Sequence, residues 1–159
     1  MQEASYSLGL EIAQKRFDEE AQRRETLDTK ASLLLGFAGI LLGIVFNLIP
    51  NISNLKVSVL TYILLTASTS AVLLSSLLAL MALWVKEYQG GPGSEILIRQ
   101  AETSTIEGMT RKLLSAYARS YQVNWKQNHR KMHFISLGFA ALAFGTLLAF
   151  LAFLTFIWV

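Results

Sequence analysis

The chain has 159 residues, of which 53% are hydrophobic and 16% charged, and its mean hydropathy is +0.43. This length allows one domain at most, and the composition is too apolar for an ordinary soluble domain. The absence of Cys excludes disulfides, iron–sulfur clusters and thiolate zinc sites, and two His are too few for an imidazole-rich metal centre. We therefore expect neither a metal nor another cofactor.

Three runs of the sequence contain no Asp, Glu, Lys or Arg: residues 31–50, 57–85 and 134–158. A membrane-spanning helix needs about 20 largely apolar residues, and each run is long enough. A soluble bundle of three such helices would have almost no polar face for water. The sequence therefore predicts an all-α integral membrane protein with three transmembrane helices.

Two charged segments lie outside these runs. Residues 1–30 have an apolar stripe at helical spacing and meet no Pro before Pro50, so we expect one amphipathic helix that continues into the first span and ends at Pro50. Residues 86–133 combine a Gly-containing loop with a second amphipathic helix that leads into the third span. Two such helices can pack together as a stalk or lie separately on the membrane surface. We favour the stalk, because the polar faces mix acids and bases.

The basic residues are distributed unevenly along the chain. Five of the fourteen Lys and Arg lie in residues 1–30, eight lie in 86–133, and the last is Lys56. Cytoplasmic segments of membrane proteins are enriched in Lys and Arg, so this distribution places both long segments in the cytoplasm. We expect a multi-pass protein of the cell inner membrane, with its N-terminus and the stalk inside and its C-terminus outside.

Small residues form faces on two of the predicted spans, and hydroxyl residues recur on the other. The first span carries Ser32, Gly36, Gly39 and Gly43, and the third carries Gly138, Ala141, Gly145 and Ala149. The hydroxyl residues of the second span are Thr61, Ser68, Thr69, Ser75 and Ser76. Such faces let helices approach closely in lipid. They can serve packing within the chain alone, or join protomers, or line a narrow pore.

Two charged residues stand at the cytoplasmic mouth of the first span. Asp28 precedes Ser32 by four residues, so it lies on the same side as the small residues, whereas Lys30 points elsewhere and can reach lipid phosphates. Two roles are open for Asp28. It can belong to a ring or gate of charges, with Lys30, at a pore entrance, or it can form a structural ion pair with the basic end of the stalk.

The sequence offers no sign of catalysis. It contains no spacing typical of a Ser-His-Asp triad, of paired catalytic carboxylates or of a metal hydrolase. The spans also lack the intramembrane acid that proton-coupled transporters use. We expect that the chain is not an enzyme, and a transporter is the weakest alternative.

Two short stretches resemble a known group of proteins. Residues 24–32 (RETLDTKAS), which run into a Gly-containing span, and residues 124–131 (NWKQNHRK), which lead into the last span, are similar to the small membrane effectors of bacterial anti-phage signalling. These are the Pycsar transmembrane and SLATT families. The resemblance implies an oligomeric effector that breaches the inner membrane and stops growth when activated. It also implies a trigger, either a cytoplasmic sensor protein or a nucleotide signal.

The leading functional prediction is a homo-oligomeric inner-membrane effector of anti-phage defence that forms a pore or disrupts the membrane. The alternative is a non-conducting anchor or interaction subunit that recruits a cytoplasmic partner through the stalk. Both interpretations have the lipid bilayer as a partner, and neither requires direct binding of nucleic acid.

Overall fold

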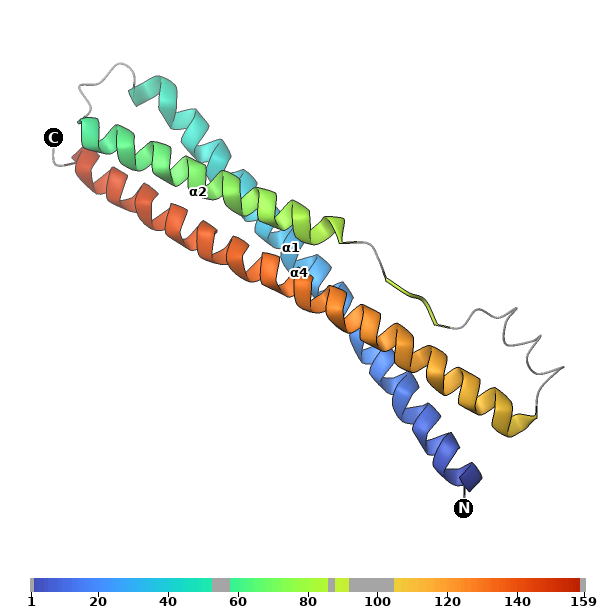
Figure 1. Cartoon of the computed structure of the whole chain (residues 1–159). Coiled ribbons are helices and arrows are strands. Elements are labelled where there is room, and N and C mark those ends of the chain that lie inside the picture. Colours follow the sequence, from blue (N-terminus) through green and yellow to red (C-terminus); the bar gives the residue numbers. More distant parts are fainter. Residues whose placement is uncertain (1, 53–57, 86–87, 92–104, 158–159) are drawn as a thin grey trace. The chain divides into compact units, whose positions relative to one another are not determined.

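The structure is a computed structural model that describes residues 2–52, 58–85, 88–91 and 105–157 (Figure 1). Its helices are α1 (Gln2–Ile52), α2 (Val59–Trp84) and α4 (Ile106–Ile157). All three are long and apolar enough to cross a membrane. The predicted all-α membrane protein with three candidate spans is therefore confirmed. The connection around Lys56, the greater part of the Gly-containing loop and the last two residues of the chain lie outside the described residues.

Helix α1 is continuous over 51 residues, so the amphipathic segment and the first span are one helix, as the sequence predicts. It ends at Ile52, two residues beyond the predicted end at Pro50. A proline lacks the backbone donor and crowds the turn before it, but the residues that follow can still complete the last turn.

Side-chain caps define where the other two helices begin. Ser58 caps α2, and its hydroxyl accepts a hydrogen bond from the Leu60 amide at 3.3 Å. Thr105 precedes α4, and its hydroxyl accepts from the Gly108 amide, also at 3.3 Å. Both bonds satisfy amide donors of a first turn, which have no partner within the helix.

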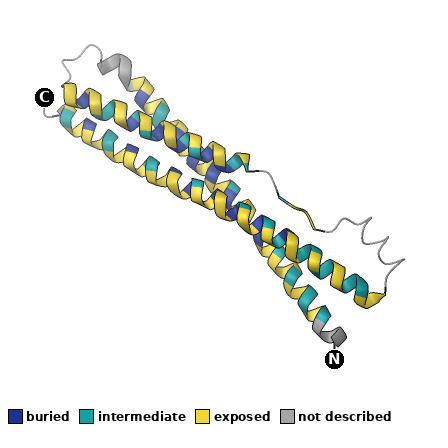
Figure 2. Cartoon of the chain, in the orientation of Figure 1, coloured by how far each residue is buried: buried dark blue, intermediate teal, exposed yellow. Residues whose placement is uncertain are grey.

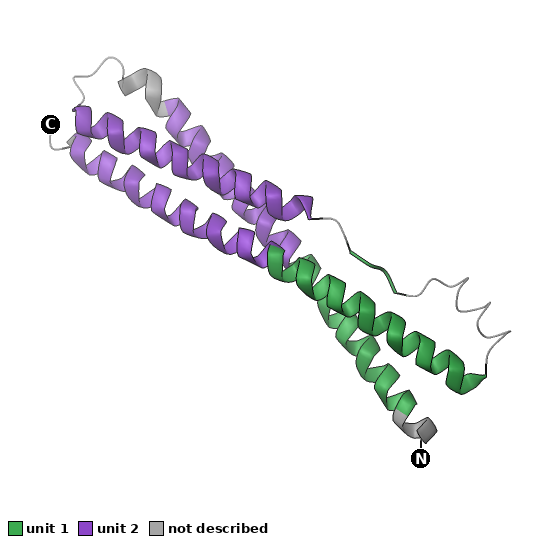
Figure 3. Ribbon diagram, in the orientation of Figure 1, with its two compact units in different colours: residues 1–26, 86–130 green, residues 27–85, 131–159 purple. Residues whose placement is uncertain are grey.

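The chain divides into two compact units (Figure 3). Unit 1 comprises residues 1–26 and 86–130, and unit 2 comprises residues 27–85 and 131–159. Helices α1 and α4 each contribute to both units, whereas α2 belongs to unit 2 alone.

Unit 2 contains the apolar part of all three helices. Leu27, Ala31, Ala82 and Ile135 form a buried cluster, and alanines and valines make up five of the six other buried apolar residues described in this unit. Most of the large apolar side chains, among them many Leu and Phe, are exposed. Figure 2 shows exposed positions along all three helices. This distribution is typical of a helix bundle in lipid, where small residues allow close packing and large apolar residues face the acyl chains.

Unit 1 pairs the N-terminal part of α1 with the N-terminal part of α4. Phe17 packs against Tyr117 edge to face, with 5.6 Å between the ring centroids. Gly9 lies beside Leu114, and Glu20 lies beside Asn128, so the contacts advance in the same direction on both helices. The two helices therefore run parallel and pack together, which is the arrangement expected of the predicted stalk.

Candidate functional site

The hydroxyl residues of α2 meet the glycines of α4 inside unit 2. The Ser68 hydroxyl donates a hydrogen bond to the Gly145 carbonyl at 2.7 Å, and the Ser75 hydroxyl donates to the Gly138 carbonyl at 2.8 Å. We call these four residues the hydroxyl–glycine seam. Both serines are at most 1% exposed. Each glycine leaves its carbonyl open to a second donor and lets the helices approach closely, so the seam fixes α2 against α4.

The other hydroxyl residues singled out in the second span occupy two different positions. Thr61 is buried, and its hydroxyl lies 2.9 Å from that of Thr155 on α4, so it extends the seam by one heptad. Thr69 and Ser76 are half-buried and donate to carbonyls of their own helix, those of Leu65 and Val72. The five hydroxyls therefore do not form one surface. A pore-lining role for them stays a prediction.

The small residues of the first span behave differently from those of the third. Ser32, Gly36, Gly39 and Gly43 are all exposed. A Cβ atom added to any of these three glycines would have nothing within 4 Å. We call these four residues the small face of α1. By contrast, Gly138 and Gly145 are buried in the seam, and Ala141 and Ala149 are half-buried. The chain therefore uses the small face of α4 internally and leaves the small face of α1 open.

An ion pair lies at the charged end of the first span. The Lys131 ammonium donates to the Asp28 carboxylate at 2.5 Å, joining α4 to α1 within unit 2. The lysine side chain is 1% exposed and the aspartate side chain 37% exposed. Of the two roles considered for Asp28, the structure contains the structural ion pair. Lys30 is exposed. A gate that includes Asp28 and Lys30 stays a prediction.

A polar cluster lies inside unit 1. The Asn128 amide group donates both to the backbone carbonyl of Glu20, at 2.8 Å, and to its carboxylate, at 2.7 Å. The Tyr88 hydroxyl donates to the Asn128 side-chain carbonyl at 2.6 Å, and the Arg24 guanidinium lies 4.0 Å from the centre of the Tyr88 ring. Asn128 is completely buried and Glu20 nearly so. Three segments distant in the sequence therefore meet on one amide.

Residues 88–91 are held on α4 as an extended strap. Asn124 pairs with the backbone of Gln89 in both directions, accepting from its amide at 2.9 Å and donating to its carbonyl at 3.0 Å. The Ser120 hydroxyl donates to the Gly90 carbonyl at 3.2 Å. The three hydrogen bonds from Ser120 and Asn124 therefore involve backbone atoms of the strap. The polar residues of 124–131 thus hold a chain segment in unit 1.

Sequence reasoning missed Glu20, Tyr88, Ser120, Asn124 and Asn128 as structural contacts. One signal could have identified three of them. Ser120, Asn124 and Asn128 follow one another at intervals of four, on the side of the helix where the apolar stripe of the preceding turns would continue. Polar residues in such positions are buried, and buried amides require hydrogen-bond partners.

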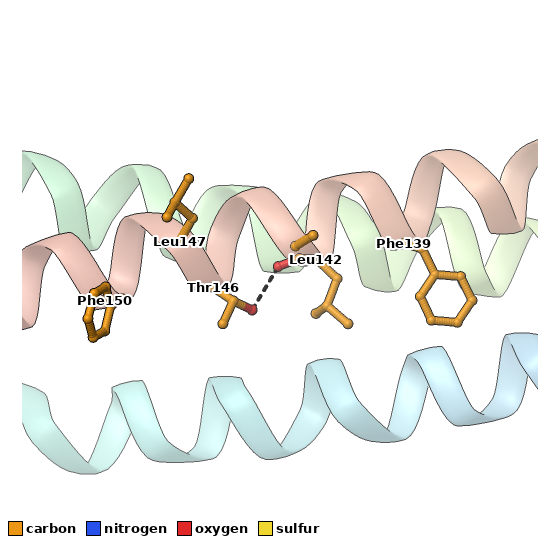
Figure 4. A pocket seen from close by; sticks show the side chains of 6 residues that line it. Phe139, Leu142, Thr146, Leu147 and Phe150 are labelled. Atoms are coloured by element: carbon orange, nitrogen blue, oxygen red, sulfur yellow. Dashed lines mark hydrogen bonds between the residues drawn. The ribbon is translucent and has the colours of Figure 1, made fainter.

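An apolar groove of about 550 Å³ lies along residues 139–150 of α4 (Figure 4). It is lined by Phe139, Leu142, Ala143, Thr146, Leu147 and Phe150. The Thr146 hydroxyl donates to the Leu142 carbonyl of its own helix at 2.8 Å. The groove therefore presents little besides hydrocarbon and suits lipid better than a polar ligand. Within the described part of the chain, no three His, Cys, Asp or Glu are placed to hold a metal ion.

Comparison with known proteins identifies a family. Residues 13–158 match the family described as Pycsar effector protein domain. No curated protein and no solved structure matches the chain. The family match spans all three helices, and it confirms the resemblance to Pycsar effectors drawn from the two short stretches. The chain therefore belongs to the Pycsar effector protein domain family and, with three candidate spans, is a membrane effector of anti-phage defence.

Proposed function

We propose that the chain is a homo-oligomeric effector of the inner membrane that breaches the bilayer when it is activated. The observation that carries this proposal is the small face of α1. This face lies on the side of a candidate span opposite the buried residues Ala31, Leu34 and Ala38. Faces of small residues are the surfaces through which helices associate in lipid. We propose that the small face of α1 contacts a second copy of the chain.

The breach itself can take two forms. A pore lined by hydroxyls of α2 requires the hydroxyl–glycine seam to open, because Ser68 and Ser75 donate to carbonyls inside the chain. A narrow path lined by apolar side chains alone would close by dewetting. Disruption of the bilayer by packed oligomers requires no such opening. In both forms, assembly precedes the breach.

Replacement of Gly39 by Leu tests the role of the small face. We expect the variant to insert and fold, because nothing lies within 4 Å of the added Cβ position, but to lose oligomer mass. The expected cost is about 1–2 kcal/mol for each contact between protomers, which is typical of close packing in membranes. The measurements are light scattering in detergent, and growth and membrane potential after induction of expression. Growth arrest and depolarisation should weaken together.

Ala67→Leu is the matched control, because it places the same Leu side chain at another exposed position of a span. It should leave the oligomer mass and growth arrest unchanged. Unchanged mass and toxicity in Gly39→Leu would contradict assembly through the small face.

A second candidate function is the non-conducting anchor that recruits a cytoplasmic partner. The observation that favours it is the internal hydrogen bonding of Ser68 and Ser75, which leaves those hydroxyls no free donor for water. An anchor would leave the membrane potential unchanged on expression, even together with its partner. The same potential measurement therefore separates the two functions.

We also propose that unit 1 lies in the cytoplasm, because thirteen of the fourteen basic residues lie in 1–30 and 86–133. The chain has no Cys, so one introduced thiol is unique. Ser53→Cys is expected to react with a membrane-impermeant maleimide in intact cells. Ser115→Cys should react only after the cells are opened. Labelling of position 115 alone in intact cells would reverse the orientation.

A further inference from the structure

One outer face of unit 1 is acidic and belongs to α1. Glu11, Asp18 and Glu25 follow one another at intervals of seven and are all exposed. Seven residues make about 700° of rotation, so the three side chains lie within about 40° of one another. Gln14 and Gln22 occupy the same side, and Lys15 lies at its edge, about 40° from Glu11 and about 60° from Asp18. We call Glu11, Asp18 and Glu25 the acidic face.

A matching basic face belongs to α4. Lys112, Arg119 and Lys126 are exposed, and they also follow one another at intervals of seven. Ser115 and Gln122 lie between them on the same side, and residues 108–133 contain no Asp or Glu at all. We call Lys112, Arg119 and Lys126 the basic face. It has the same spacing as the acidic face and the opposite charge.

The two faces point away from each other on opposite outer sides of unit 1. On α1, the acidic face lies about 160° around the helix from Glu20, which contacts α4. On α4, the basic face lies about 160° around from Tyr117, which contacts α1. Neither face can therefore neutralise the other within one copy, but the acidic face of one copy can meet the basic face of the next.

The acidic face and the basic face lie at similar heights along the two helices, so they can meet between neighbouring copies. The pairs Phe17–Tyr117 and Glu20–Asn128 set residues of α1 level with residues about 100–108 positions later in the sequence. Each acid is therefore about three residues, or about 4.5 Å, from the level of one base. Long Lys and Arg side chains span this distance. Copies in the same membrane share one level, so a lateral contact requires no vertical shift.

We propose that the acidic face of one copy docks on the basic face of the next copy. This inference rests on the proposed homo-oligomer and names the contact that aligns its subunits in unit 1. The contact joins two different surfaces, so it propagates head to tail and closes into a ring when the rotation between neighbours allows it. Single exposed ion pairs are weak, but three in register set the partner and the orientation.

The test uses two charge-reversed proteins in detergent at physiological salt. The first carries Glu11→Lys, Asp18→Lys and Glu25→Lys, and the second carries Lys112→Glu, Arg119→Glu and Lys126→Glu. Each protein then has the same charge on both faces, so we expect its self-association to fall by about tenfold or more. An equimolar mixture offers opposite charges at every contact and should recover the wild-type mass by light scattering. Recovery also shows that both proteins fold.

Single substitutions provide the matched control. Asp18→Lys and Glu19→Lys make the same change of charge at neighbouring exposed positions, but Glu19 lies about 100° away from the acidic face. Only Asp18→Lys should weaken association. For the wild type, 1 M salt should weaken association relative to 0.15 M, because the screening length falls from about 8 Å to about 3 Å.

Three outcomes would overturn the proposal. An oligomeric wild type with unchanged mass in both reversed proteins contradicts this contact and leaves the oligomer intact. Loss of association in the second protein alone assigns the basic face to an anionic partner other than α1. A monomeric wild type contradicts the proposed oligomer and this contact with it.

Discussion

Gly145→Ala is expected to lower the free energy of unfolding by about 1–3 kcal/mol, although it adds a single methyl group. The new Cβ would lie 2.9 Å from Val72 Cγ2, 3.1 Å from the Ser68 carbonyl oxygen and 3.2 Å from Ala71 Cβ. The Ser68 carbonyl oxygen is a backbone atom and the Ala71 Cβ is fixed to the backbone, so neither can rotate away from the new methyl group. Helix α2 must move, and the hydrogen bond between Ser68 and Gly145 lengthens.

Gly39→Ala is the matched comparison, and the opposite sign is expected. The added methyl group meets nothing within 4 Å, and Ala is favoured over Gly inside a helix by up to about 1 kcal/mol. Gly138→Ala should fall between the two, because the closest atom, Leu34 Cδ2 at 2.6 Å, is the end of a flexible side chain. Thermal unfolding in detergent, followed by circular dichroism, measures all three. Equal melting temperatures for Gly145→Ala and Gly39→Ala would contradict the packing described for the seam.

Asp28→Ala is expected to destabilise the protein by about 3 kcal/mol or more, because it leaves the buried Lys131 ammonium without its carboxylate. Lys131→Met should cost much less. This substitution removes the buried charge and replaces the lysine by a methionine of similar length. The Asp28 carboxylate that is left is exposed enough to remain hydrated. The asymmetry follows from burial, since the two residues share one ion pair.

The double variant, with both substitutions, should be more stable than Asp28→Ala alone, because it no longer contains a buried ammonium that has lost the Asp28 carboxylate. Lys30→Met is the control, as it removes an exposed base two residues from Asp28 and should change stability by less than about 0.5 kcal/mol. The same thermal unfolding experiment applies. Equal losses in Asp28→Ala and Lys131→Met would show that Lys131 is not buried as described.

The helices and spans could be predicted from the sequence because their signals are local. Charge-free runs of 20 residues or more have few alternatives to a membrane span. The continuity of α1 likewise follows from the absence of Pro before position 50. These features depend on neighbouring residues only, so no knowledge of the third dimension is required.

The use of each small face could not be predicted. Both Gly36–Gly43 and Gly138–Gly145 repeat at seven residues, so both spacings match the hydroxyl residues of α2 equally well. The structure pairs α2 with the glycines of α4 and leaves those of α1 exposed. Helix α2 could pack against the glycines of α1 or against those of α4. The choice depends on how whole helices are placed side by side, and the spacing of glycines within one helix does not determine that placement.

The polar contacts were predictable in kind but not in partner. Asp28 could be expected to meet a base of the charged segments, but the choice of Lys131 depends on the register between α1 and α4. The pairing of Asn128 with Glu20 depends on the same register. A shift of one helix by a single turn would bring different residues together, and hydropathy does not change with such a shift.

The strap has a consequence for how this protein can vary. Asn124 recognises the amide and the carbonyl of Gln89, and Ser120 recognises the carbonyl of Gly90, so the groups that specify the attachment are carried by α4. The side chain of residue 89 takes no part in it. Substitutions at position 89 can accumulate without loss of the attachment, whereas Asn124→Ala removes two hydrogen bonds at once. Position 89 is therefore expected to vary more freely than position 124, whereas Tyr88 is constrained by the bond from its own hydroxyl to Asn128.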